Sequence, residues 1–379
     1  MVPFEFHSRT RVVFGHGTIA RLGQIARELG FAKTLLVADQ GVIDAGHVAQ
    51  AVRILERATV ETTVFSDFGV NPDSAMVKAG AQFAEPLGID SLIGLGGGSS
   101  LDCAKGINFL LTNGGTMADY RGYGKASTPL LPMIGVPTTA GTGSEAQSYA
   151  VIADARTHMK MACGDPTAAV RVAILDPDLT VTAPRHVTAA AGFDAIAHAV
   201  ETAVTVRRSP MSDTFSHRAW RLLNDGFERV LLHPADADAR AAMQLGSHFA
   251  GMAIEQSMLG AAHACANPLT ARYDMPHGGA LAILLPHVVR WNAAVALDRY
   301  AALIGHEWRA GEQDAADMLA RRLEDLAAAG NLPLTLSESG VEAEALEDLS
   351  AQAAQQWTGT FNPRPFDAAG ALEIYQAAM

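Results

Sequence analysis

The apolar pattern of this chain changes near residue 180, and that change restricts the possible folds more than any other feature. Before it, short β-type runs alternate with helical stretches at residues 19–29 and 74–87, which is typical of an α/β domain with a mostly parallel sheet. After it, long Ala- and Leu-rich segments at residues 189–206, 239–264 and 314–329 predict helices. The expected strands cover residues 11–14, 34–37, 60–65, 91–93, 132–136 and 172–175.

The change in pattern predicts two domains. A chain of 379 residues, 49% hydrophobic and 18% charged, can bury a sizeable core and has the length of about two domains. Prolines at 177 and 184 make a natural joint, because the residue before a proline is pushed out of the helical region. We therefore expect an α/β domain over residues 1–182 and a helical domain over residues 183–379.

One carboxylate and three imidazoles in the second half suggest a metal site. Asp194 and His198 are four residues apart in an expected helix, so both project from one face, and His263 and His277 follow later. Three histidines with a carboxylate suit a divalent transition metal. Any single histidine among the 13 is more often packed or solvated than a ligand. The stretch around Asp194 is otherwise apolar, however, and an unpaired carboxylate there would be costly to bury.

A glycine-rich run at residues 94–102 predicts a phosphate cradle. It follows the expected strand at 91–93 and opens a helix expected at 101–111, so its backbone amides could bind a pyrophosphate. Compared with the dinucleotide-binding fingerprint, the run is only a partial match. It lacks the third glycine, follows about the fourth strand, and has no acidic residue ~20 positions downstream. A plain tight turn remains the alternative. No Gly-Lys-Ser/Thr follows, which excludes a Walker motif.

Two further polar positions follow expected strands. Asp39 directly follows the strand at 34–37, where a carboxylate could accept from the ribose hydroxyls of NAD and repel the 2′-phosphate of NADP. Asp39 could equally cap a helix. The loop at residues 137–145 offers hydroxyls and glycines at the same edge of the sheet, or forms a simple Ser/Thr-rich turn.

Charge and cysteine content restrict the binding partners and the cellular compartment that we expect for this protein. A net charge of −12 and a pI near 5.5 argue against nucleic acid or an anionic membrane as partner and favour a small-molecule ligand. Three widely spaced cysteines offer no disulfide framework, which suggests a reducing compartment. The first residues do not resemble a signal peptide, and Pro286 and His287 interrupt the apolar run at 280–289 before it could span a membrane. A cytoplasmic location is expected.

Five motifs together resemble the iron-containing, or group III, alcohol dehydrogenases, in order from about residue 5 to 290. The resemblance implies an amino-terminal Rossmann-like dinucleotide-binding domain, a carboxy-terminal helical metal-binding domain, and Asp194, His198, His263 and His277 as metal ligands. The motifs are GGGS at 96–99 with Asp102, GVPTTAGTGSE at 135–145, ILDP at 174–177, GFDAIAHAVE at 192–201 and PHG at 276–278. The implied cofactor-binding residues are Asp39, Asn71, Gly97, Gly98, Ser99, Asp102, Thr138, Thr139, Tyr149, Lys160 and Leu179.

The chain departs from the family near the implied catalytic positions, His277 and residue 267. Members commonly read His-Ala-Met-Ala-His from the third ligand, whereas this chain has Cys265 and Asn267. An amide cannot relay a proton, a role suggested for the replaced histidine. Asn267 could instead cap a turn before Pro268, and Cys265 suits a packed thiol better than a nucleophile. Residues 254–256 also differ from the usual Phe-Ser-Asn, so the substrate pocket is expected to differ too.

The resemblance implies a metal-dependent oxidoreductase that transfers a hydride between a small alcohol, or a hydroxy acid, and NAD, reversibly reducing the aldehyde or ketone. Fe(II) is the expected metal, with Zn(II) as the alternative, and a homodimer the expected assembly. A hydroxyacid-oxoacid transhydrogenase is one alternative function. A cyclase of the dehydroquinate synthase type is another, but it needs a basic pocket for which only scattered residues such as Arg272 and Arg290 are candidates. A non-catalytic metal-stabilised module would leave the phosphate cradle without a purpose.

Overall fold

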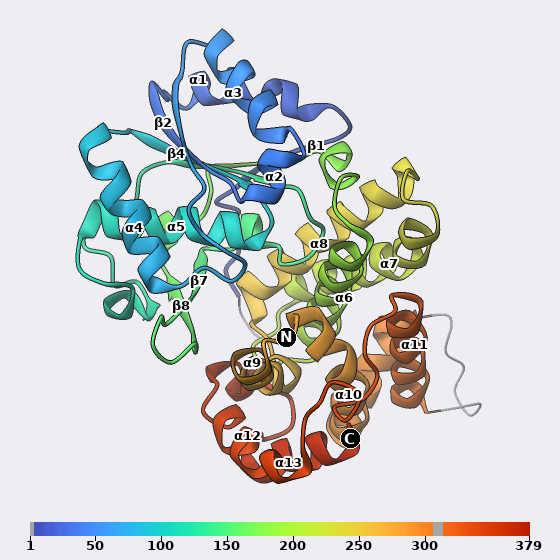
Figure 1. The fold of residues 1–379 in the computed structure, drawn as a ribbon. Coiled ribbons are helices and arrows are strands. Elements are labelled where there is room, and N and C mark those ends of the chain that lie inside the picture. Colours follow the sequence, from blue (N-terminus) through green and yellow to red (C-terminus); the bar gives the residue numbers. More distant parts are fainter. Residues whose placement is uncertain (1–3, 306–313) are drawn as a thin grey trace. The chain divides into compact units, whose positions relative to one another are not determined.

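The computed structural model describes residues 4–305 and 314–379, which fold as two compact units (Figure 1). One unit spans His7–Ala183 and contains all the strands of the described residues. The other spans Pro184–Met379 and is helical. Residues 4–6 also belong to the helical unit, where the ring of Phe6 packs 5.7 Å from that of Phe215.

The main sheet has six parallel strands in the order β1-β9-β6-β4-β2-β3. All six runs expected from the sequence are strands, which confirms the α/β prediction for this unit. The strands are β1 Arg11–Phe14, β2 Lys33–Val37, β3 Glu61–Phe65, β4 Ser91–Gly96, β6 Met133–Pro137 and β9 Val172–Leu175.

A second, three-stranded sheet was not predicted. It consists of β5 Gly122–Tyr123, β7 Tyr149–Ala153 and β8 Lys160–Gly164, in the order β5-β8-β7. Strands β7 and β8 are antiparallel and pair from Tyr149 with Gly164 to Ala153 with Lys160. These short strands mix buried and exposed positions, so no apolar run revealed them in the sequence.

Helices cover both faces of the main sheet (Figure 1). Successive residues of a strand point to opposite faces, so Leu35 packs in the core under α4 and α5, whereas Leu36 packs in the core under α1 and α3. Burial on both faces leaves the carboxyl edge of the sheet as the place for a ligand. The helices of this unit are α1 Leu22–Glu28, α2 Gln40–Asp44, α3 His47–Arg57, α4 Ser74–Ala84 and α5 Gly98–Asn113, with 3-10 turns η1 Thr18–Arg21, η2 Glu85–Leu87, η3 Met117–Tyr120, η4 Ser144–Ala146, η5 Pro166–Ala168 and η6 Pro177–Thr180.

The helical unit contains a break between two helices that the sequence did not predict. The single helix expected over residues 239–264 is two helices, α8 and α9, because Met258 takes a left-handed backbone conformation with φ of 64°. The helices are α6 Arg185–Thr202, α7 Pro210–Leu232, α8 Ala237–Ser257, α9 Ala261–Tyr273, α10 His277–Ile304, α11 Ala315–Ala329, α12 Leu346–Ala353 and α13 Ala368–Ala377, with 3-10 turns η8 Ala343–Ala345 and η9 Trp357–Phe361.

Helix α10 runs past the two residues that were expected to interrupt the apolar run at residues 280–289. Pro286 and His287 do not interrupt it, and it continues to Ile304. Among the described residues it is the one helix long and apolar enough to cross a membrane, but 61% of its most apolar window is buried inside the protein. It packs against α6, α9 and α11, as the core helix of a helical domain does.

Candidate metal centre and cofactor-binding loops

One face of α6 carries three buried ionisable side chains. Asp194, His198 and Glu201 occupy positions i, i+4 and i+7, so they lie in one row along the helix. Their exposed fractions are 5%, 5% and 3%. Such groups are rarely buried unless they are paired or bind an ion, so this face is the natural starting point for a site.

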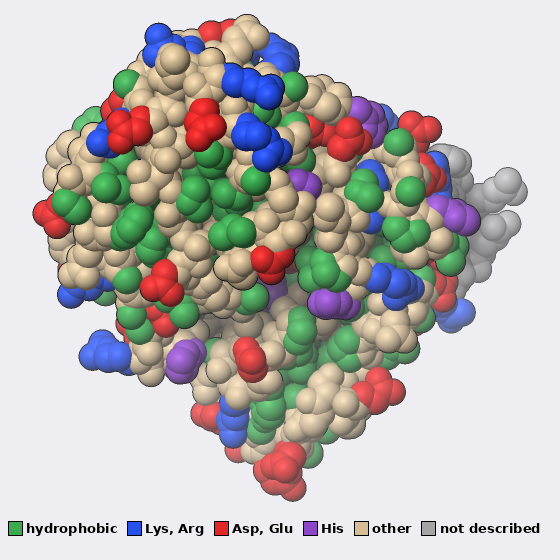
Figure 2. All heavy atoms as spheres, turned by 45° about the horizontal axis from the view of Figure 1, so that its top comes forward, with side chains coloured by type: hydrophobic (Ala, Val, Ile, Leu, Met, Phe, Trp, Pro, Cys, Tyr) green, Lys and Arg blue, Asp and Glu red, His purple; other side chains and the backbone are tan. Residues whose placement is uncertain are grey.

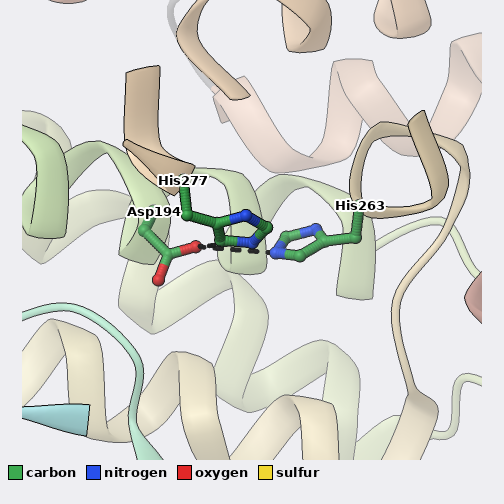
Figure 3. Close-up of side chains that lie close together, drawn as sticks. All are labelled: Asp194, His263 and His277. Carbon is green, nitrogen blue, oxygen red and sulfur yellow. Dashed lines mark ion pairs between the residues drawn. The ribbon is translucent and has the colours of Figure 1, made fainter. Parts of the chain in front are cut away.

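Two other helices bring imidazoles to Asp194. His263 lies in the first turn of α9 and His277 begins α10. The Nε2 atoms of His198, His263 and His277 lie 3.2, 3.5 and 4.0 Å from Asp194 Oδ1. The candidate ligand atoms of Asp194, His263 and His277 are all within 4.8 Å of one another, and Figure 3 shows these three side chains pointing toward one point. The structure thus brings together all four side chains that the sequence singled out.

A glycine allows α10 to begin against α6. A Cβ atom at Gly278 would lie 2.0 Å from the backbone oxygen of Ala190. Only glycine fits such an approach, and the neighbouring His277 thereby lies near Asp194. The Pro-His-Gly motif therefore supplies both an imidazole and the close helix contact that positions it.

The charges in this cluster favour a cation. Burial raises the pKa of the Asp194 carboxyl, but the nearby His198, His263 and His277 together hold it well below its usual range. Burial lowers the pKa of His263, but the charges of Glu201 and Asp194 outweigh burial and raise that pKa to about 9. The two carboxylates thus stabilise positive charge among the three imidazoles.

The donor set fits a divalent transition metal. Asp194 Oδ1 and His263 Nε2 are buried and have no hydrogen-bond partner in the described part of the chain. Ligand atoms ~2.1 Å from one tetrahedral centre would lie roughly 3.4 Å apart, which is close to the separations from Asp194 Oδ1. A carboxylate with neutral imidazoles suits Fe, Zn, Co or Ni.

The outer nitrogens of two imidazoles also have partners. His263 Nδ1 lies 2.5 Å from Glu201 Oε2, and His277 Nδ1 lies 3.4 Å from the hydroxyl of Thr270. These contacts orient the two rings so that Nε2 faces Asp194.

The two unusual residues of α9 have structural surroundings. Asn267 is half-buried inside the helix and donates a hydrogen bond to Gln356 Oε1 at 3.2 Å. The alternative that Asn267 caps a turn before Pro268 is wrong, since α9 continues through this proline to Tyr273. Cys265 is fully buried, and burial raises the pKa of its thiol, so it is a packed neutral thiol.

In the α/β unit, Asp39 and the glycine-rich loop meet at the carboxyl ends of neighbouring strands β2 and β4. Asp39 caps α2 by accepting from the backbone N–H of Val42, so the capping interpretation is correct. Its other oxygen accepts from the hydroxyl of Ser100 at 3.0 Å. A side chain at Gly96, where φ is 146°, would collide with Ser100 Oγ at 2.3 Å.

The loop leads directly into α5, which begins at Gly98 and not at the expected residue 101. Its N-cap residue Gly97 offers no side-chain cap, so the amides of the first turn can face an anion. The hydroxyl of Ser99 accepts from the backbone N–H of Asn71, and the N–H of Thr138 donates to the carbonyl of Gly96. Thr139 Oγ1 would be 3.4 Å from a Cβ at Gly97. These candidate cofactor residues therefore surround one helix N-terminus.

The remaining cofactor-binding candidates are Asp102, Tyr149, Lys160 and Leu179. Burial raises the pKa of Asp102, which accepts from the hydroxyl of Ser144 at 2.6 Å, while Lys105 and Lys160 act on it in the opposite direction. Tyr149 begins β7 and Lys160 begins β8. Leu179 lies in η6, where its side chain is 3% exposed and packs in the core under α1 and α3.

A buried lysine fastens the loop after β6. Lys105 is 0% exposed, and its Nζ donates to the carbonyl oxygens of Ser144, Gln147 and Tyr149 and to the hydroxyl of Ser144, at 2.7 to 3.0 Å. In the sequence, only a lone charge within an apolar helix pointed to this contact.

We expect Lys105→Met to lower the free energy of unfolding by about 3 kcal/mol, because it leaves several buried acceptors without a donor. Urea denaturation measures this change. Lys78→Met removes an exposed lysine of α4 and should stay within about 0.5 kcal/mol of the unmodified protein. Equal midpoints for both variants would show that Lys105 does not hold the loop.

Comparisons with known proteins identify the family. Residues 9–177 match the model for iron-containing alcohol dehydrogenase, and residues 188–379 match the model for the carboxy-terminal part of the Fe-containing alcohol dehydrogenase family. The chain belongs to the iron-containing alcohol dehydrogenase family. As a member it is an enzyme, an alcohol dehydrogenase that transfers a hydride. The family implies NAD and an iron-type metal.

Several relatives within this family cover nearly the whole chain. The chain is 32% identical to a 1,3-propanediol dehydrogenase of Citrobacter freundii, over 96% of both proteins. It is 31% identical to an NAD-dependent methanol dehydrogenase of Bacillus methanolicus, over 93% of both. The solved structure of a 1,3-propanediol oxidoreductase superposes with a TM-score of 0.95, at 31% identity and full coverage of both chains. A sulfoacetaldehyde reductase of Bifidobacterium kashiwanohense, solved with NAD+, gives a TM-score of 0.89 at 26% identity, with 100% and 99% coverage.

The sequence did not reveal the contact between Glu201 and His263. A signal was present, since Glu201 is seven residues after Asp194 and shares its helix face, but i+7 spacing alone does not distinguish such a contact from packing.

Proposed function

We propose that this alcohol dehydrogenase uses a divalent metal held by Asp194, His198, His263 and His277 to interconvert a small alcohol, or a hydroxy acid, and its aldehyde or ketone. The observation that supports it is the convergence of three imidazole Nε2 atoms on the buried Asp194 Oδ1. Fe(II) is the proposed metal and Zn(II) the alternative. When bound, the metal supplies a Lewis acid for the substrate oxygen, and NAD exchanges the hydride.

The residues of the α/β unit bind NAD in this proposal. The amides of Gly98 and Ser99 at the start of α5 hold the pyrophosphate, and Asp39 accepts from the adenosine ribose with lone pairs not used in capping α2. The other proposed contacts are Asn71, Gly97, Asp102, Thr138, Thr139, Tyr149, Lys160 and Leu179.

Asn267 takes a binding role in this proposal. Its amide can donate and accept hydrogen bonds but has no proton to transfer near neutral pH, so Asn267 itself would not carry the substrate proton. Asn267 lies one helical turn after His263 in α9, which places both on the same face of that helix. We therefore assign Asn267 to orientation of the substrate or cofactor.

A substrate panel tests the proposed function. Protein reconstituted with Fe(II) or Zn(II) without oxygen should oxidise at least one small alcohol or hydroxy acid with NAD, followed by NADH absorbance. Hydrogen transfer only between a hydroxy acid and an oxo acid, with no free NADH, would instead show a transhydrogenase. Release of phosphate from a sugar phosphate would show a cyclase.

The proposed contact of Asp39 predicts the choice of cofactor. The unmodified enzyme should prefer NAD over NADP at least about tenfold in kcat/KM, because the carboxylate repels the 2′-phosphate. Asp39→Asn keeps an oxygen that can cap α2 but removes the charge, so the ratio of kcat/KM with NAD to kcat/KM with NADP should fall toward one. Asp44→Asn removes an exposed charge from the same helix and should leave the preference unchanged. Comparable use of both cofactors by the unmodified enzyme would contradict the contact.

Assembly and location are proposals as well. We propose a homodimer in the cytoplasm, with small-molecule alcohols and aldehydes as the only partners besides cofactor and metal. Strand β1 is an edge of the main sheet and exposes Val12 and Phe14, as an edge that pairs with another chain would. Light scattering after gel filtration measures the mass. On the face shown in Figure 2, basic side chains are interspersed with acidic ones and gather in no broad patch.

A further inference from the structure

We propose that Glu201 is a positioning residue of the metal centre, which holds His263 with its proton on Nδ1 and its lone pair on Nε2. The inference rests on the proposed metal centre and adds a residue outside the ligand set. Glu201 lies on the same face of α6 as Asp194 and His198, so one helix supplies two ligands and the group that orients a third.

Both carboxylate oxygens of Glu201 face α9. Oε2 lies 2.5 Å from His263 Nδ1, and Oε1 accepts from the backbone N–H of Ala262 at 2.7 Å. Asn362 Oδ1 accepts from the preceding N–H, that of Ala261, at 3.2 Å. Glu201 therefore fixes both the ring of His263 and the first turn of the helix that carries it, where a negative charge is favoured.

The backbone makes room for this contact. A Cβ at Gly260, the N-cap of α9, would lie 3.0 Å from Glu201 Oε1 and 2.9 Å from Asn362 Oδ1. A carboxylate only 3% exposed could not otherwise approach the helix end so closely. The start of α9 is thus shaped around Glu201.

The hydrogen bond determines which ring nitrogen is free. An imidazole that binds a metal is neutral, with one N–H and one lone pair, and a carboxylate oxygen only accepts, so in that form Nδ1 donates to Glu201. The lone pair is then on Nε2, the buried nitrogen that lacks a hydrogen-bond partner in the described residues and faces Asp194. Such outer partners fix the orientation of a ligand and raise its basicity.

Glu201→Gln tests this arrangement with almost no change in size. If the amide oxygen accepts from Ala262, the amide NH2 faces His263 Nδ1 and places the ring proton on Nε2, where it blocks a metal. The opposite orientation sets NH2 against the N–H of Ala262. We expect the Kd for Zn(II), measured by competition with a chelator, to rise about 10- to 100-fold.

Asn362→Ala is the matched control for helix capping. It removes the acceptor for Ala261, together with the hydrogen bonds of Asn362 to Asn292 and to the carbonyl of Arg364, but leaves the contact of Glu201 with His263. It should therefore lower the melting temperature of the metal-free protein and keep the Zn(II) Kd within about threefold. Glu201→Asp retains a carboxylate and should bind Zn(II) more tightly than Glu201→Gln. A Zn(II) Kd for Glu201→Gln within twofold of the unmodified value would overturn the proposal.

A spectroscopic measurement needs no variant. Nitrogen-15 spectra of the histidines in the Zn(II)-loaded protein should show His263 protonated on Nδ1 and coordinated through Nε2, and coordination through Nδ1 would overturn the proposal. Failure of the unmodified protein to bind Zn(II) would overturn the metal centre and this inference together. Normal binding with an unchanged Glu201→Gln variant would overturn only the role of Glu201.

Discussion

Asp194→Asn is expected to remove the metal and abolish turnover while the α/β unit stays folded. Asp194 is the single negative charge among the four proposed ligands, and its Oδ1 is the atom on which the imidazoles converge. Removal of one partner from a buried charged cluster costs ~3–5 kcal/mol, and a loss of that size in the metal site corresponds to roughly 10²- to 10⁴-fold weaker metal binding. Elemental analysis after dialysis and kcat with NAD measure the two effects.

Asp225→Asn is a suitable control because Asp225 is an exposed carboxylate of the neighbouring helix α7. It should keep full metal content and turnover. Unchanged metal content together with normal turnover in Asp194→Asn would exclude Asp194 from the site.

Local spacing predicted part of this site, and the family resemblance supplied the rest. Asp194 and His198 are four residues apart, so the pitch of α6 alone places them together. His263 is about 70 residues away in the sequence, so helical periodicity cannot relate it to Asp194. Only the family motifs related the two residues. The proposed role of Glu201 could be inferred only from the structure, because its contacts with Ala262 and His263 reach from α6 to the first turn of α9.

The fold was similarly predictable where apolar periodicity is strong. The central strands β2, β4, β6 and β9 are buried along almost their whole length, and their continuous apolar runs were found together with the edge strands β1 and β3. Strands β5, β7 and β8 were missed, because more than half of their residues are exposed or only partly buried. The break between α8 and α9 depends on the single residue Met258 in a left-handed conformation, which residue type does not favour. Pro268 and Pro286 lie inside helices because packing outweighs the loss of one hydrogen bond.

Adjacent glycines at the start of α10 should respond in opposite ways to the same substitution. Gly278→Ala places a methyl group 2.0 Å from the Ala190 oxygen, so α10 and α6 must separate and His277 must leave its place 4.0 Å from Asp194. Overpacking of this kind costs about 1–3 kcal/mol of folding free energy. We also expect at least about tenfold weaker Zn(II) binding, by the loss of one well-placed ligand.

Gly279→Ala meets no atom closer than Pro333 Cγ at 3.5 Å, an ordinary contact. Alanine is favoured over glycine within a helix by ~0.5–1 kcal/mol, so this variant should be neutral or slightly more stable and should bind Zn(II) normally. Thermal unfolding of the metal-free proteins and chelator competition measure both quantities. If the two variants behave alike, the contact between Gly278 and Ala190 does not set the position of His277. A loss confined to Gly278→Ala would show that the glycine of the Pro-His-Gly motif acts through helix spacing, since glycine has no side chain that could bind the metal itself.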